Sequence, residues 1–457
     1  MNDQSLANPF SSAFRTSSAL LVFLVATSAF ILVPSLLLLL IPVAAVTLIW
    51  MVFRWPMIAL GLVLAFMPID FMAIALGKFF GFPHMTVVSV CDKEVPLLLL
   101  AVILWKRNGF QPAAADWFLL ASLAIAAVRT VLGGTVVGLW LDFNFVIPYL
   151  VGRMTVLTEA QEQMWARCAV WIMGVLSVLG LIEVFIIGEV PRTLLYAAIG
   201  SEGTDEGLSA SFHAAGFTGL REAATTVGPN GFGAFCMIAL ILWWVYCRNP
   251  LPASMVAVGL VCSLTRSAWV GTAAAIPFLA ILMKQNKRFF LYATVGLSLF
   301  VASIPILGLA DFITNNRTGQ EESAESHQEK ILGGLQFVVE HPLGAGNEKL
   351  SPGQGEVNNV GAFETTYPQL AAEYGIAVVL LFAGFLFSAL RSVWQEKNRL
   401  GHAAAGILVS MSMVMVVTLP LNDRRLACWA LFPIGLAIRS SISQKTSLAA
   451  NPERRLA

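Results

Sequence analysis

Long apolar runs alternate with short polar connections along most of the chain. Many of these runs approach the roughly 20 apolar residues that an α-helix needs to cross the hydrocarbon core of a bilayer. We predict membrane spans in two sets, near 18–33, 35–53, 57–75, 91–105, 116–131, 135–152 and 164–187, and near 228–247, 251–265, 267–283, 289–308, 371–390, 402–420 and 426–439. Because the shortest runs can also be half-helices, the pattern predicts an all-α integral membrane protein with about 12–14 transmembrane helices.

The composition agrees with this class of protein. Of the 457 residues, 57% are hydrophobic and only 12% are charged, whereas a soluble domain carries about 25% charged residues. The six cysteines lie in or beside apolar runs and form no ligand-like pair, so we expect neither a disulfide nor a metal site. No phosphate-binding loop or nucleotide fingerprint is present, and nothing indicates binding to nucleic acid.

Basic residues recur in alternate connections between the predicted spans. They are Arg54, Lys106, Arg107, Arg153, Arg248, Lys284, Lys287, Arg288, Arg391, Lys397 and Arg399. Because basic connections stay on the cytoplasmic side, both termini are predicted there, and two long loops are predicted on the outer side. The chain then divides into an N-terminal transmembrane bundle, a first outer loop, central transmembrane helices, a large outer loop, and C-terminal helices with a cytoplasmic tail: 1–187, 188–227, 228–308, 309–370 and 371–457.

The large outer loop contains an amphipathic pattern from Glu329 to Glu340. Its apolar residues recur at helical spacing, at Ile331, Leu332, Leu335, Val338 and Val339. This spacing predicts a helix with one apolar face that lies on the membrane surface or over the bundle. Pro342 and the glycines that follow it should end the helix.

Arg266 lies between two apolar runs that almost no loop separates. A charged side chain costs on the order of 3 kcal/mol at the centre of a bilayer. Arg266 must therefore lie at the membrane face or in a polar cavity, where such residues commonly serve function. The small residues around it, Ser263, Thr265, Ser267 and Gly271, allow helix backbones to approach closely.

Four short motifs follow one another on the predicted outer side. They are Arg221 before Pro229-Asn230-Gly231-Phe232-Gly233; Ser263 to Gly271, with Arg266 inside; His341-Pro342-Leu343-Gly344-Ala345-Gly346; and Glu364 and Tyr367 before Glu373-Tyr374-Gly375. Together they resemble the superfamily of O-antigen ligases and O-antigen polymerases. The resemblance covers roughly residues 215–390, and the N-terminal half only by topology.

This resemblance implies a multi-pass glycosyltransferase of the bacterial inner membrane with its active site facing the periplasm. Such enzymes move a glycan from undecaprenyl diphosphate to a glycan or lipid-linked acceptor, without a cofactor or metal. Ligases of the family carry a histidine where this chain has Glu364. At this position the chain is more similar to the branch of the family associated with exopolysaccharide. The difference leaves open whether the chain is a ligase or a polymerase.

The implied chemistry suggests roles for individual residues. A departing diphosphate needs fixed positive charge, and a guanidinium can hold phosphate oxygens bidentately, so Arg266 and Arg221 are the first candidates. The acceptor hydroxyl needs a general base, for which Glu364 is the candidate and His341 a rival, although a histidine before proline also suits a helix C-terminus.

Further residues are candidates for substrate binding. Lys93 either contacts a phosphate or pairs locally with Asp92 or Glu94, and Arg424-Arg425 lie in a tight outer turn within reach of a lipid headgroup. Tyr367 either stacks on a sugar or belongs to an interfacial aromatic belt. Two acidic residues inside apolar runs, Asp142 and Glu183, should pair with Arg129 or Arg153 or hydrogen-bond between helices.

The alternative function is a transporter of a small anion or of a lipid-linked saccharide. Asp142, Glu183 and Arg266 would then line a pathway across the membrane. Transporters commonly show internal repeats with paired broken helices, and the sequence shows no such symmetry. The large outer loop also suits chemistry at one face, so the enzyme is the favoured hypothesis.

Overall fold

The computed structural model describes residues 46–79, 93–188, 223–226, 228–285, 287–291, 332–347, 365–416, 418, 420–421 and 423–450. These residues are almost entirely helical and contain no strand, which confirms the all-α class. The labelled helices are α3 (Pro56–Phe66), α4 (Asp70–Phe79), α6 (Glu94–Asn108), α7 (Ala114–Gly133), α8 (Val136–Phe143), α9 (Val146–Met154), α10 (Glu159–Ile182) with the π-helical η1 (Glu183–Ile187), α13 (Pro229–Tyr246), α14 (Pro250–Cys262), α15 (Arg266–Leu282), α19 (Thr366–Tyr374), α20 (Ile376–Trp394), α21 (Arg399–Met415) and α22 (Arg424–Ala450).

Within the described part of the chain, five helices are long and apolar enough to cross a membrane. They are α7, α10 continued by η1, α13, α20 and the first twenty residues of α22. Two bent pairs, α3–α4 and α8–α9, raise the number to seven if each pair is one span. The helices α14, α15 and α21 are shorter and also apolar. The expected span at 18–33 lies outside the described residues, and only residues 289–291 of the span at 289–308 are described. The total number of transmembrane helices therefore remains a prediction.

Three expected spans are interrupted. The helix axis bends by 70° between α3 and α4 and by 50° between α8 and α9, where the sequence pattern predicts continuous helices. Pro68 lies in the first break, and it has no N–H group to continue the hydrogen bonds of the helix. The span expected at 371–390 is interrupted at Gly375, whose φ of +98° glycine adopts readily.

The buried helix α13 is the centre of the fold. It packs against α10, α14, α15, α21 and α22, and nearly all of its side chains are buried. The rings of Phe235 and Trp429 meet edge to face, with centroids 5.2 Å apart. Beside this core, α9 and α22 approach closely because Gly152 has no side chain: a Cβ there would lie 2.2 Å from the Phe432 carbonyl oxygen.

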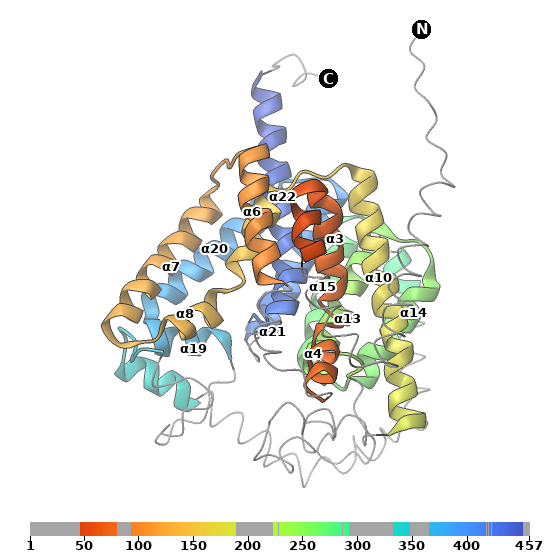
Figure 1. Cartoon of the computed structure of the whole chain (residues 1–457), viewed down its shortest axis with the longest axis horizontal. Coiled ribbons are helices and arrows are strands. Elements are labelled where there is room, and N and C mark those ends of the chain that lie inside the picture. The colour runs from red at the N-terminus through yellow and green to blue at the C-terminus, as the bar shows by residue number, and fades with distance from the viewer. Residues whose placement is uncertain are drawn as a thin grey trace.

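One end of the bundle collects the starts of several helices. Helices α6, α13, α15 and α22 all begin at the end opposite the basic connections, in the lower half of Figure 1. We call it the outer end, following the orientation that the basic connections predict. The opposite end holds the buried ion pair of Arg153 and Asp116, with 2.8 Å between nitrogen and oxygen.

The expected amphipathic helix is present over 332–340 and ends before His341, as the sequence predicts. Its contact face is narrower than expected. Val338 is buried against Ala371 and Ala372 of α19, and Phe337 packs beside it. By contrast, Leu332, Leu335 and Val339 are exposed apolar side chains.

Candidate functional site at the outer end

The turn between α14 and α15 presents Arg266. Ser263 and Thr265 in this turn are buried, and the Thr265 hydroxyl donates to the Pro229 carbonyl at the start of α13, at 2.8 Å. Gly233 makes room for the turn, because a Cβ there would lie within 3 Å of both side chains. Arg266 follows as the exposed first residue of α15, so a fixed backbone presents this side chain at the outer end.

The start of α22 lies next to the start of α13. A Cβ on Gly231 would lie 3.4 Å from Asp423 Oδ2. Asp423 accepts from Arg425, whose Nε lies 3.2 Å from Oδ1. The guanidinium of Arg425 also lies over the ring of Phe71, 5.6 Å from its centroid. The outer ends of α15, α13 and α22 are thus neighbours in this order.

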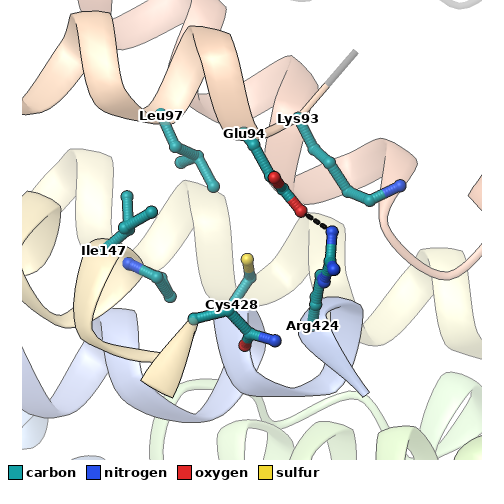
Figure 2. A pocket seen from close by; sticks show the side chains of 8 residues that line it. Lys93, Glu94, Leu97, Ile147, Arg424 and Cys428 are labelled. Carbon is teal, nitrogen blue, oxygen red and sulfur yellow. Dashed lines mark hydrogen bonds and ion pairs between the residues drawn. The ribbon is translucent and has the colours of Figure 1, made fainter. Parts of the chain in front are cut away.

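Lys93 and Arg424 each pair with a carboxylate. The Lys93 ammonium contacts Asp70 Oδ2 at 2.7 Å, and both side chains are buried. The Arg424 guanidinium pairs with Glu94, as Figure 2 shows. The ion pairs form two adjoining groups: Lys93, Asp70, Arg425 and Asp423 in one, and Arg424 with Glu94 in the other. We call these six side chains at the outer end the charge network.

A pocket opens beside this network. Figure 2 shows Lys93 and Glu94 above Cys428, Arg424 beside it, and Leu97 and Ile147 on the opposite, apolar side. Asn144 and Pro148, at the break between α8 and α9, complete the lining. The empty volume is about 270 Å³, which includes space open to solvent.

A second polar cluster surrounds Asp142. The Tyr374 hydroxyl donates to Asp142 Oδ2 at 2.6 Å, and Gln369 donates to Glu373 Oε1 at 2.9 Å. Burial, followed by the charge of Asp142, raises the pKa of Glu373 well above its usual range. The hydrogen bonds from Gln369 and Tyr374 to Asp142 link α8 to α19.

The expected pairing of Asp142 with Arg129 or Arg153 is not the arrangement found. Arg153 pairs with Asp116, and Arg129 donates to the Gly344 carbonyl. Asp142 instead forms hydrogen bonds between helices, which is the other arrangement that the sequence allows.

Two of the sequence motifs form one structure, which we call the glycine clasp, residues 344–347. Ala345 N–H donates to the Ala372 carbonyl at 2.7 Å, and Gly346 N–H donates to the Glu373 carbonyl at 3.0 Å. Gly344 and Gly346 have positive φ values of 81° and 93°, and a Cβ on Gly346 would lie 1.9 Å from the Gly133 carbonyl oxygen. The clasp therefore requires glycine at both positions.

Asn347 fixes the clasp to two helices. Its Nδ2 donates to the Thr135 carbonyl at 3.0 Å and to the Tyr374 hydroxyl at 2.9 Å. Its Oδ1 accepts from Thr135 N–H at 2.6 Å. The loop after the helix over 332–340 is thereby held against α8 and α19.

His341 and Tyr367 lie in different surroundings. His341 is exposed, its ring stacks on Phe337, and its Nδ1 lies 3.2 Å from the Phe337 carbonyl oxygen. This contact suits a residue that terminates a helix. Tyr367 is half-buried in α19 beside Phe382 of α20, with ring centroids 6.4 Å apart.

Two candidates, Arg221 and Glu364, lie outside the described residues. The chain directly after Glu364 is described. Thr365 is buried, and the Thr366 hydroxyl donates to the Thr418 carbonyl at 2.9 Å, in the connection between α21 and α22.

Where the structure describes the chain, no group of three or more His, Cys, Asp or Glu side chains could hold a metal ion. The five cysteines there are free thiols. That the protein uses no metal remains a prediction. Sequence reasoning missed Asp70, Asn144 and Asp423. The partners of Asp70 come from other elements, whereas Asn144 and Asp423 contact Leu141 and Arg425 nearby in the sequence. The one sequence signal of these three residues is that each lies at a helix end or beside a break.

Residues 251–383 match the model of the O-antigen ligase family. The match supports membership of the O-antigen ligase superfamily. A search of curated proteins found no match to the chain. The matched O-antigen ligase segment begins in α14 and ends in α20, so it includes Arg266, His341, Glu364 and Tyr367. Lys93 and the Arg424-Arg425 pair lie outside it.

Proposed function

We propose that this protein is a membrane glycosyltransferase that moves or polymerises a glycan from an undecaprenyl-diphosphate donor onto a sugar acceptor. The reaction takes place at the periplasmic face of the bacterial inner membrane, in O-antigen or exopolysaccharide biosynthesis. The observation that carries the proposal is the position of Arg266: it lies inside the segment that matches the O-antigen ligase family and is exposed at the outer end.

In the proposed reaction, the bond between the anomeric carbon and the bridging phosphate oxygen breaks. Its electron pair goes to the departing undecaprenyl diphosphate. The acceptor oxygen forms the new bond to the anomeric carbon, and its proton passes to Glu364. Arg266 and Arg221 stabilise the negative charge that develops on the leaving oxygen.

Within the charge network, Arg425 supports the binding of a lipid diphosphate. Arg425 Nη1 is buried, and no described residue accepts a hydrogen bond from it. An unpaired N–H at the outer end suits a phosphate oxygen of the donor. In this proposal, Lys93 and Arg424 bind the substrate next to Arg425, Tyr367 lines the cavity, and His341 borders it.

A transporter remains the alternative function, and one observation favours it. Helices α3–α4 and α8–α9 are broken spans with polar residues at the breaks, and broken helices are typical of transporter binding sites. The charge network, however, gathers at helix ends on one side of the bundle, which suits chemistry at one face.

Deleting the gene distinguishes the two functions. We expect the polymeric or ligated glycan to disappear, while lipid-linked glycan accumulates on the periplasmic face. An impermeant glycosidase added to spheroplasts should release this glycan, because export precedes the missing step. Lipid-linked glycan that resists the enzyme until the membrane is opened would contradict the proposal and support transport.

The helix over 332–340 should cover the site as a lid. Replacing Val338 with Asp places a charge against Ala371 and Ala372, at a cost of about 3 kcal/mol or more. We expect transfer activity to fall because the lid no longer docks on α19. Leu335→Asp is the matched control, because Leu335 is 49% exposed. Wild-type turnover by Val338→Asp would show that the helix does not contribute to the reaction.

A further inference from the structure

Asn144, one of the residues that line the pocket of Figure 2, has a buried side-chain oxygen without a hydrogen-bond donor among the described residues. Asn144 lines the pocket and is 5% exposed. Its Nδ2 donates to the Leu141 carbonyl at 2.8 Å, whereas no described residue donates to its Oδ1. The orientation of the amide is fixed, because a flipped amide would bring two oxygens together at Leu141.

The charged groups of the pocket are already paired with each other. Lys93 pairs with Asp70, and Arg424 pairs with Glu94. An anion that enters the pocket would have to displace a carboxylate from one of these cations. The pocket therefore favours a neutral ligand over a phosphate group.

The unpaired atom defines the chemistry of that ligand. A buried carbonyl oxygen without a donor costs about 1–3 kcal/mol. The wall beside Asn144 is apolar, formed by Leu97, Ile147 and Pro148. A ligand with a hydroxyl or amide N–H and an apolar face satisfies both features, and a sugar ring offers both.

The pocket lies beside the arginines that we propose bind the diphosphate of the donor. Arg424 borders the pocket, while the next residue, Arg425, has the unpaired Nη1. Arg425 Nη1 thus lacks a hydrogen-bond acceptor, and Asn144 Oδ1 lacks a donor. A sugar attached to a phosphate supplies both, with a phosphate oxygen for Arg425 and a hydroxyl for Asn144.

We propose that Asn144 recognises the first sugar of the lipid-linked donor by accepting a hydrogen bond from one of its hydroxyl or N–H groups. This inference rests on the proposed function. It makes Asn144 a specificity-determining residue, since a donor sugar that lacks this group would leave Oδ1 unpaired.

The test uses the full-length protein in lipid nanodiscs. Lipid-linked glycan extracted from the native membranes is the donor, and bare undecaprenyl diphosphate is a competitive inhibitor. For Asn144→Ala we expect the KM of the glycan donor to rise about tenfold, which corresponds to the loss of one buried hydrogen bond. The inhibition constant of the bare lipid should stay at the wild-type value, because it has no sugar.

A control variant separates recognition from folding. Asn108→Ala removes an asparagine at the inner end that donates to the Met154 carbonyl in the same way, and both constants should remain unchanged.

The outcomes distinguish this inference from the proposed function. Equal changes for the glycan donor and the bare lipid in Asn144→Ala, or no change for either, would overturn the role of Asn144 while transfer by the wild type continued. Absence of transfer by the wild type would overturn the proposed function itself.

Discussion

Replacing Arg266 with alanine should reduce glycan transfer by on the order of 10²–10³-fold, because a fixed positive charge no longer stabilises the departing diphosphate. Arg266 is exposed at the first turn of α15, so the variant should reach the membrane in normal amounts. The measurement is the rate of product formation in a glycan ladder assay, normalised to the amount of protein. Arg248→Ala is the control, since Arg248 is exposed at the inner end.

The lysine variant makes the prediction about Arg266 more specific. Arg266→Lys keeps the positive charge but removes the planar fork that holds two phosphate oxygens. We expect its activity to stay well below that of the wild type. Full activity in Arg266→Lys would show that a point charge suffices, and the role of a bidentate phosphate clamp would be wrong.

The second large effect is expected at Glu364. Glu364→Gln keeps the shape of the side chain but removes the basic carboxylate, so turnover should fall by about 10²–10⁴-fold. Binding of the donor should persist, because the arginines hold the diphosphate. Turnover and the dissociation constant of bare undecaprenyl diphosphate are measured on the same preparation. Glu340→Gln, at the exposed end of the helix over 332–340, is the control.

Substitution by histidine relates Glu364 to the ligases that the chain resembles. If Glu364 occupies the position of their histidine, Glu364→His should recover part of the activity that Glu364→Gln loses. Polymer formation at the wild-type rate by Glu364→Gln would instead transfer the role of the base to His341. Glu373 is a weaker replacement, because its side chain is buried and already accepts a hydrogen bond from Gln369.

Hydrophobic periodicity predicts most of the helices but not their breaks. Each apolar run is long enough to identify a span, yet the composition of a run is the same whether the helix is straight or bent. Pro68 and Gly375 are the local signals at two breaks. Pro148 is the corresponding signal at the break between α8 and α9, because it has no N–H to bond to the Asn144 carbonyl. This break brings Asn144 to the pocket.

The partners of the site residues could not be predicted, because they depend on how the helices pack. Lys93 pairs with Asp70, 23 residues away, and Arg424 pairs with Glu94, 330 residues away. The sequence indicates only that such charges need partners near a membrane. Local pairing was therefore a reasonable expectation for Lys93, and the bend after α3 explains why Asp70 lies close enough to replace it.

The glycine motifs show what an ordered set of motifs can and cannot predict. Their sequence order supports the resemblance to O-antigen ligases, which the family match over 251–383 bears out. The sequence does not predict that Gly344 and Gly346 fold against Gly375 and Gly133. In the structure these glycines hold the clasp against α7, α19 and α20, so their role is to position the outer loop.

The most direct test of the central claim is an experimental structure with bare undecaprenyl diphosphate bound. We predict that the phosphates lie at the outer end, within hydrogen-bonding distance of the Arg266 guanidinium and next to the start of α22. Phosphates bound instead at the inner end, beside Arg153 or Arg288, would contradict the claim.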